Sequence, residues 1–358
     1  MVLVRLALLP FSFLYRAVTF TRNWLYDKGI LSSTGFDIPI ISVGNLSVGG
    51  TGKTPQVEYL IRALQNDYKL AILSRGYGRS SKGFVLGNST STAKEIGDEP
   101  LQYLLKYPQV NVAVCENRVK GAKELLMLKP EIEIIILDDA FQHRAIKPGL
   151  QILLTEYSNL FCDNYHLPSG TLRESSKGMK RADMIVVTKT PSILSPMERR
   201  RIESKLKPFS YQTIYYSWIK YGDFLPTWQV PGPQVIGKDF YFQRGYQILL
   251  FTGIANPSLL FTYLKDSGAR VQLMRFPDHH NYNEADVERI RTEYESIKSS
   301  NKLILTTEKD MMRLKTEFGE FLKNYKVFYI PIESHFHEND DKNFKKQVNR
   351  FIADQRSV

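Results

Sequence analysis

The feature that most restricts the fold of this 358-residue chain is a glycine-rich segment between a buried strand and a helix. It reads Ser47-Val-Gly-Gly-Thr-Gly-Lys-Thr54, and it follows an apolar run at 37–44 and precedes a helical pattern at 54–66. Strand, loop and helix in this order are the setting that a phosphate-binding P-loop requires. Closely spaced glycines let backbone N–H groups point inwards at phosphate oxygens, and the following helix adds a favourable dipole. The segment therefore predicts a nucleotide-binding α/β fold.

Two side chains of this loop carry the chemistry. We expect Lys53 to reach the β- and γ-phosphates of a nucleoside triphosphate and the Thr54 hydroxyl to ligate Mg²⁺. Ser47 stands where the general P-loop pattern has its first glycine, which lowers the specificity of the pattern alone. A glycine-rich turn with a chance Gly-Lys-Thr is the alternative, and the strand–loop–helix order disfavours it. The predicted nucleotide-binding residues are Ser47, Val48, Gly49, Gly50, Thr51, Gly52, Lys53 and Thr54.

Apolar runs alternate with helical patterns along most of the chain. The run at 132–137 is almost continuously apolar, which is typical of strands buried on both faces of a parallel sheet. Such alternation predicts a doubly wound, mostly parallel sheet. Aromatic residues and prolines then crowd together before shorter strand–helix units resume. We predict a P-loop core at 29–210, an extended linker at 211–245 and a smaller C-terminal α/β domain at 246–358.

Asp138 and Asp139 follow directly after the run at 132–137. Carboxylates at the carboxyl end of a buried strand lie beside the P-loop in this architecture, where one of them can hold Mg²⁺. Adjacent residues of an extended backbone point to opposite sides, so we expect one of the two to face the metal, and the sequence does not say which. The alternative is an Asp-Asp turn at the entry to a loop.

Residues 1–28 are apolar and aromatic with basic residues and no acid before Asp27. Arg5 and Arg16 interrupt the apolar run before it reaches the length of a membrane-spanning helix, and no signal-peptide cleavage site follows. We predict an amphipathic helix that lies on an anionic membrane surface. A terminal helix docked on the protein's own core is the alternative. The formal charge of +11 favours anionic partners, which include acidic lipids, phosphorylated substrates and nucleic acid.

The motifs occur in a fixed order over most of the chain. They are Gly44-Asn-Leu-Ser-Val-Gly-Gly-Thr-Gly-Lys-Thr-Pro55, Ser74-Arg-Gly-Tyr-Gly78, Gly97-Asp-Glu-Pro100, Asp138-Asp-Ala-Phe-Gln-His-Arg144, Pro168-Ser-Gly-Thr-Leu-Arg-Glu174, Phe276-Pro-Asp-His279 and Thr306-Thr-Glu-Lys-Asp310. In this respect the chain resembles the tetraacyldisaccharide 4′-kinase (lipid A 4′-kinase) family. The serine at the first P-loop position belongs to that family's pattern, whereas Ala140 replaces its usual glycine.

The resemblance implies an ATP- and Mg²⁺-dependent kinase at the cytoplasmic face of the bacterial inner membrane. Its acceptor is the 4′-hydroxyl of an acylated glucosamine disaccharide 1-phosphate, and its product is lipid IVA. A sugar hydroxyl must lose its proton during transfer, and the family match makes Asp98 the base. His279 of the second domain would orient Asp98, although the adjacent His280 leaves that assignment open. An N-terminal helix cap is the alternative role for Asp98.

The resemblance also implies a set of acceptor-binding residues. Guanidinium groups suit phosphate oxygens, and Tyr77 between two glycines suits a sugar. Glu174 would bind the sugar or tune Arg173, and for each of these residues a surface salt bridge is the alternative. The predicted acceptor-binding residues are Arg75, Tyr77, Arg118, Arg173 and Glu174.

The runner-up interpretation is a P-loop GTPase or metallochaperone that acts as a nucleotide switch. Such a protein needs a guanine-reading Asn-Lys-x-Asp element, and the segment at 187–190 is only a partial likeness without the aspartate. No nucleic-acid-binding module is apparent, so we expect no nucleic-acid partner. Cys115 and Cys162 form no Cys-x-x-Cys motif and are expected to be reduced thiols.

Overall fold

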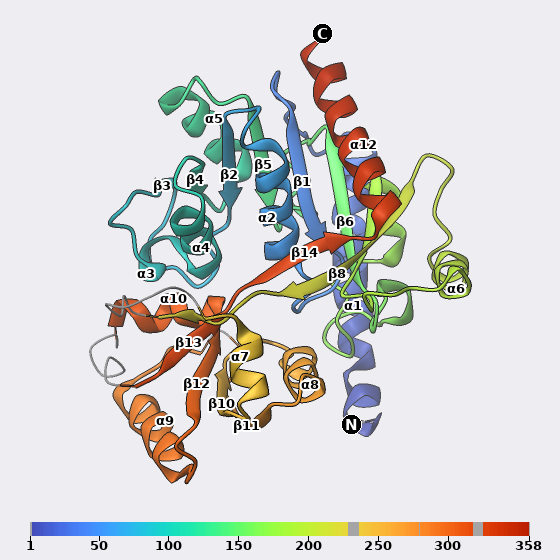
Figure 1. Cartoon of the computed structure of the whole chain (residues 1–358). Coiled ribbons are helices and arrows are strands. Elements are labelled where there is room, and N and C mark those ends of the chain that lie inside the picture. Colours follow the sequence, from blue (N-terminus) through green and yellow to red (C-terminus); the bar gives the residue numbers. More distant parts are fainter. Residues whose placement is uncertain (1, 228–235, 279, 318–324, 358) are drawn as a thin grey trace.

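The computed structural model describes residues 2–227, 236–278, 280–317 and 325–357. A large sheet with helices on both faces lies next to a smaller sheet with its own helices (Figure 1). The strands of the large sheet are β1 (Ile40–Asn45), β2 (Leu70–Ser74), β3 (Val85–Leu86), β4 (Asn111–Val114), β5 (Ile134–Asp138), β6 (Leu150–Glu156), β7 (Met184–Thr188), β8 (Thr213–Tyr221) and β14 (Ile332–Phe336).

In the large sheet, the strand order is β14-β8-β7-β6-β1-β5-β2-β4-β3. The strands from β8 to β4 pair in parallel, whereas the edge strands β14 and β3 are antiparallel to their neighbours. The predicted doubly wound, mostly parallel fold is therefore confirmed. Its first strand, β1, lies between β5 and β6, so the carboxyl ends of these three strands meet at the point where the chain order reverses, which is where such folds bind ligands.

Alternate residues of each central strand face two separate apolar layers. Ile41 and Val43 of β1 pack towards one layer and Ile40 towards the other, and these side chains are at most 1% exposed. The helices around the sheet are α2 (Lys53–Leu64), α3 (Ala93–Ile96), α4 (Asp98–Lys106), α5 (Arg118–Leu128), α6 (Pro196–Leu206) and α12 (Glu338–Arg356), with 3₁₀ turns η1 (Phe161–Asp163) and η2 (Ser176–Arg181). Because α2 follows β1 directly and packs on this core, the P-loop between them is held at both ends.

The smaller sheet forms a C-terminal domain. Its order is β11-β10-β12-β13-β9, parallel from β11 to β13 and antiparallel between β13 and β9. Its elements are β9 (Leu225–Pro226), α7 (Lys238–Gln243), β10 (Gln247–Thr252), α8 (Ser258–Asp266), β11 (Arg270–Arg275), α9 (Glu284–Ser296), β12 (Lys302–Thr307), α10 (Glu308–Glu317) and β13 (Val327–Ile330).

The strand pairing divides the chain differently from the predicted linker at 211–245 and the predicted C-terminal domain at 246–358. The strand β8, within the predicted linker, pairs in parallel with β7. The strand β14 returns from the C-terminal domain to pair with β8, and α12 then packs on the large sheet. The two sheets are thus joined by two adjacent strands, and the smaller domain is inserted between β8 and β14 (Figure 1).

The N-terminal helix α1 (Val2–Asp27) contains Pro10 and docks on the large domain through its polar side. Ser12 is buried against Ser169, and the Tyr15 hydroxyl donates to the Arg173 carbonyl at 2.9 Å. The opposite side carries exposed apolar residues, which are Phe11, Phe13, Leu14, Val18, Phe20 and Trp24. None of the helices in the described residues is long and apolar enough to cross a membrane. The helix therefore lies against the large domain through its polar side.

Candidate active site

The P-loop adopts a conformation that only glycine takes readily at two positions. Gly49 and Gly52 have φ angles of +107° and +83°, and Gly52 is the residue before the first turn of α2. Asn45, at the end of β1, donates from Nδ2 to the Thr51 hydroxyl at 2.7 Å. Thr188, at the end of β7, donates to the Thr51 carbonyl at 2.8 Å. The loop is therefore braced by the ends of two strands.

A second segment runs beside the loop and positions Arg173. The Val48 N–H donates to the Thr171 carbonyl at 2.7 Å, and the Arg173 N–H donates to the Leu46 carbonyl at 2.8 Å. The Arg173 guanidinium then reaches both carboxylate oxygens of Asp139, at 2.8 and 2.9 Å. The chain thus carries the predicted acceptor-binding Arg173 to the predicted metal-binding Asp139.

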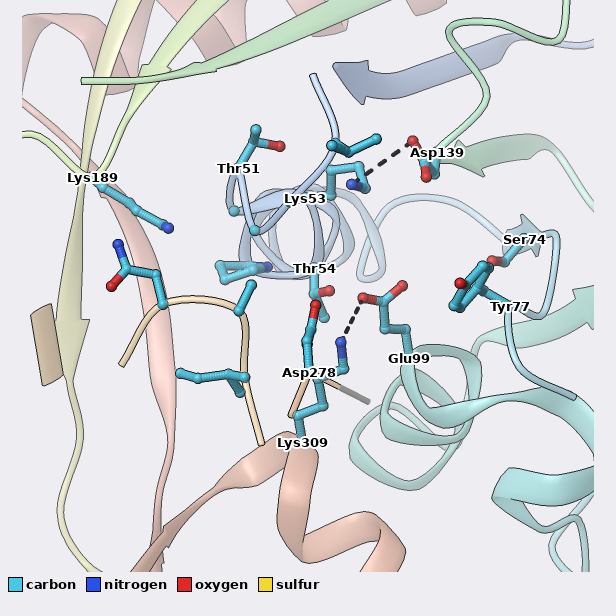
Figure 2. Close-up of a pocket in the computed structure, with 18 of the residues that line it drawn as sticks. Thr51, Lys53, Thr54, Ser74, Tyr77, Glu99, Asp139, Lys189, Asp278 and Lys309 are labelled. Atoms are coloured by element: carbon cyan, nitrogen blue, oxygen red, sulfur yellow. Dashed lines mark hydrogen bonds and ion pairs between the residues drawn. The ribbon is translucent and has the colours of Figure 1, made fainter. Parts of the chain in front are cut away.

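Asp138 and Asp139 have opposite electrostatic surroundings. Asp138 is fully buried, and burial, followed by the carboxylates of Glu99 and Asp139, raises its pKa to about 7. Burial also acts to raise the pKa of Asp139, but Lys53 and Arg173 outweigh it and hold that pKa below its usual value. The Lys53 ammonium lies 3.8 Å from Asp139 Oδ1 (Figure 2). Asp139 is therefore the carboxylate held in its charged form beside the P-loop lysine.

The residues at this edge of the sheet fit Mg²⁺. One carboxylate oxygen of Asp138, Oδ1, is buried without a hydrogen-bond partner among the described residues. Together with the Asp139 carboxylate and the Thr54 hydroxyl it offers hard oxygen donors, which Mg²⁺ prefers. The described residues contain no group of three or more His, Cys, Asp or Glu side chains suited to a metal.

A cavity of about 820 Å³ opens in front of the P-loop, between the two domains (Figure 2). Most of the residues predicted for nucleotide and acceptor binding line it. Tyr77 is 70% exposed at its rim, and Arg75 is exposed beside it. Arg118 is only 2% exposed, and it donates to the carbonyls of Cys115 and Asp138. The predicted residues that line the cavity are Val48, Gly49, Gly50, Thr51, Gly52, Lys53, Thr54, Arg75, Tyr77, Arg118, Asp139 and Arg173.

Glu174 lies behind the cavity wall. Its side chain is 1% exposed, and its oxygens accept from Asn23 at 2.7 Å and from Gln142 at 3.0 Å. They also accept from Arg181 at 2.7 and 3.1 Å. The carboxylate thus ties α1 to the segment that carries Arg173. The predicted contact between Glu174 and a sugar has no counterpart in this placement, because protein donors already occupy both oxygens.

Asp98 is the first residue of α4, after Gly97 with a φ of +94°. Its side chain is 15% exposed, and its Oδ2 accepts from Arg313 Nε of α10 at 2.8 Å. It therefore belongs to the first turn of the helix and is not the residue that caps it. His279 lies outside the described residues. The Nε2 of the adjacent His280 lies 2.8 Å from Asp286 Oδ2.

Several cavity residues escaped the sequence analysis. Glu99 and Lys309 form an ion pair of 3.5 Å across the two domains, and Asp278 points towards Thr54 (Figure 2). Lys189 directly follows β7 and has a φ of +56°. Its Nζ lies 3.4 Å from Glu156 Oε2, and its side chain faces the P-loop (Figure 2). Glu99, Asp278 and Lys309 stand inside the quoted motifs, which could have singled them out, and Glu99 and Asp278 directly adjoin Asp98 and His279. Lys189 lies in the segment 187–190, whose pattern indicates only a partial guanine-reading element.

A family model described as LpxK, tetraacyldisaccharide-1-P 4′-kinase, matches residues 4–353. The chain belongs to this family. A protein of Bacteroides thetaiotaomicron named tetraacyldisaccharide 4′-kinase is 42% identical over 354 residues, which are 97% of this chain and 93% of that protein. One of the same name from Flavobacterium johnsoniae is 44% identical over 356 residues, 98% of each chain.

A solved structure agrees over the whole fold. LpxK from Aquifex aeolicus, crystallised in complex with ATP, aligns with 98% of this chain and 99% of its own at a TM-score of 0.75 and 32% identity. The resemblance drawn from the motifs is therefore confirmed, and the protein is a member of a kinase family. The GTPase or metallochaperone interpretation is not supported.

Proposed function

We propose that this protein transfers the γ-phosphoryl group of ATP to the 4′-hydroxyl of a tetraacyldisaccharide 1-phosphate, which yields lipid IVA. Membership of the 4′-kinase family supports the reaction class. The observation that carries the proposal is the cavity in front of a braced P-loop, in which Lys53 lies beside a charged Asp139 and Arg173. A sugar hydroxyl bound against Arg173 would sit next to the terminal phosphate held by the P-loop.

Each step has a candidate group on the chain. The P-loop amides and Lys53 hold the phosphates, and Thr54, Asp138 and Asp139 would hold Mg²⁺, which neutralises charge on the phosphate oxygens. The Asp98 carboxylate accepts the proton of the 4′-hydroxyl while the 4′-oxygen of the sugar bonds to the γ-phosphorus. The bond between the γ-phosphorus and the β–γ bridging oxygen breaks at the same time, and ADP leaves with that oxygen. Arg75, Tyr77, Arg118 and Arg173 bind the acceptor. Glu174 acts by holding the segment of Arg173 in place.

The membrane surface is the proposed site of action. An acylated acceptor stays in a bilayer, so the cavity must open near one. The helix α1 turns its polar side to the protein and exposes Phe13 and Phe20 at 73% and 65%. A helix with exposed aromatic residues and basic neighbours suits an anionic lipid surface, here the cytoplasmic face of the inner membrane.

Phosphate transfer tests the reaction. Purified protein with ATP, Mg²⁺ and a tetraacyldisaccharide 1-phosphate in mixed micelles is expected to add a second phosphate to the lipid, detected by mass spectrometry. Lys53→Ala and Asp98→Asn are each expected to lower kcat about 10²-fold or more, since they remove phosphate stabilisation and the base. Asp67→Asn, an exposed aspartate in the turn after α2, is the matched control. Transfer by Asp98→Asn at the wild-type rate would remove Asp98 from the mechanism.

Vesicle binding tests the location. The double variant Phe13→Ser with Phe20→Ser is expected to sediment less with vesicles that contain phosphatidylglycerol, and to keep its thermal unfolding midpoint. Ile193→Ser changes an apolar residue before α6 that is more exposed (88%) than either phenylalanine, and this variant is expected to bind as the wild type does. Equal sedimentation of the double variant and the wild type would contradict a membrane role for this face.

A further inference from the structure

The motif Thr306-Thr-Glu-Lys-Asp310 has no part in the proposed reaction, yet its residues build a contact across the two domains. It ends β12 and begins α10, and the side chains of α10 meet those of α4. Lys309 pairs with Glu99 at 3.5 Å, and Glu308 accepts from Lys106 at 3.0 Å. The α4–α10 contact therefore joins the helix that begins with Asp98 to the C-terminal domain.

Asp310 anchors the start of α10 from inside the C-terminal domain. It is fully buried, and it accepts from the Thr252 and Thr307 hydroxyls at 2.7 Å each. The Gly253 N–H and the Tyr282 hydroxyl donate to it at 3.1 Å. A buried carboxylate with this many donors is fixed in position.

Arg313 connects this fixed carboxylate to Asp98, the proposed base. It lies three residues after Asp310 on α10, is 7% exposed, and places Nη1 3.6 Å from Asp310 Oδ1. Its Nε donates to Asp98 Oδ2 at 2.8 Å, and Nη2 donates to the same oxygen. Two donors of one planar guanidinium on one oxygen set the direction of the carboxylate, which a single flexible ammonium would not do.

The guanidinium cannot itself take the proton of the acceptor. Burial acts to lower the pKa of Arg313, but Asp98 and Asp310 outweigh it and raise that pKa. A permanent positive charge at this distance stabilises the ionised form of Asp98, which is the form that a base needs. Among the described residues, the other titratable groups at the contact are Glu308, Lys309 and Asp310 on α10, Glu99 and Lys106 on α4, and His280, which pairs with Asp286. The His280 carbonyl accepts from Arg313 Nη1 at 3.4 Å.

We propose that Arg313 is a positioning residue for phosphoryl transfer: braced by Asp310, it holds the Asp98 carboxylate ionised and oriented at the domain boundary. The inference rests on the proposed function, in which Asp98 is the base. It makes transfer depend on the seating of α10 against α4, so the C-terminal domain contributes to the reaction through a residue outside the cavity lining.

The pH dependence of kcat tests the inference. An opposite charge within hydrogen-bonding distance shifts a carboxyl pKa by about one to three units. Arg313→Met is therefore expected to move the acid limb of the kcat profile upwards by about one unit or more, which is about a tenfold loss at a pH below the limb. The KM for ATP is expected to stay unchanged. Arg313→Lys keeps the charge and is expected to restore the position of the limb in part.

Two further measurements determine whether Arg313 acts through Asp98. In an Asp98→Asn background, Arg313→Met is expected to cause less than a twofold further loss. Arg291→Met, on α9 of the same domain, removes an ion pair with Glu288 and a hydrogen bond to the Tyr325 hydroxyl, and is the matched control. A uniform loss at every pH, or an effect that multiplies with Asp98→Asn, would reduce Arg313 to a structural role. A wild-type rate in Asp98→Asn alone would instead overturn the base, and with it this inference.

Discussion

Variants of Glu174 distinguish two roles for this residue of the family motif. It either contacts the acceptor or holds in place the segment that carries Arg173. Its carboxylate is buried with protein donors on both oxygens, and its partner Arg181 is 11% exposed. Glu174→Ala removes the acceptor that this guanidinium shares with Asn23 and Gln142, and among the described residues leaves Arg181 with only the Phe141 carbonyl as an acceptor. Removing one partner of a buried ion pair costs about 3–5 kcal/mol of unfolding free energy. Glu174→Gln keeps the volume and one acceptor but loses the charge, so we expect a smaller cost of about 1.5–3 kcal/mol.

Chemical denaturation followed by tryptophan fluorescence measures the free energy of unfolding, and steady-state kinetics measure kcat and KM. Because Glu174 holds the segment of Arg173, we expect kcat and the KM for the acceptor to worsen in proportion to the lost stability, and the KM for ATP to change little. Glu198→Gln breaks an exposed pair with Arg201 on α6 and is the control, for which we expect no measurable change. The double variant Glu174→Gln with Asn23→Ala is expected to be less destabilised than the sum of the single variants.

One result would refute this reasoning. If Glu174→Gln unfolds as the wild type does and raises only the KM for the acceptor, the carboxylate must touch the sugar. The motif-based assignment would then be right, and the buried arrangement described above would have to open when the acceptor binds.

Three further variants test other parts of the structure. Burial and the nearby arginines, led by Arg118, lower the pKa of His143 to about 4, so the unfolded chain binds the extra proton and stability falls as the pH drops from about 6.5 to 4; His143→Gln should flatten this fall in unfolding midpoints measured across that range. Gly44→Ala would place a Cβ 2.7 Å from Phe141 Cβ, and calorimetry is expected to show a loss of about 1–3 kcal/mol with a weaker kcat from a displaced Asp139. Phe344→Ala empties a fully buried site on α12 and should cost about 3–5 kcal/mol in urea unfolding, whereas Phe351→Ala, half-buried on the same helix, should cost clearly less.

Local patterns predicted the elements that are buried on both faces. The apolar run at 132–137 contains most of β5 (Ile134–Asp138), whose five residues are all buried, because a continuous apolar pattern depends only on burial. The P-loop and the acidic pair were also predictable, since each follows a buried strand and needs particular residue types.

The missed elements depend on partners that are distant in the sequence. The strand β8 has aromatic residues on both faces and looked like a linker, because its pairing with β7 and β14 is not visible locally. The sequence predicted an amphipathic helix at 1–28 but did not show which of its faces would contact the protein. The polar face does so because Ser169, Arg173 and Glu174 supply its hydrogen-bond partners from more than 150 residues away. Arg313 belongs to no motif, and only the tertiary structure brings it to Asp98.

The return of the chain to the large sheet has a consequence for synthesis on the ribosome. The helix α2, which starts at the P-loop, packs its Tyr59 ring against Phe336 and Phe344, at 4.8 and 5.6 Å between ring centroids. Until those late residues emerge, the nascent nucleotide-binding half has an uncovered apolar face, whereas the inserted domain is already complete. The first half to be translated is thus the last to close, and the growing chain depends on protection from aggregation for almost its whole length.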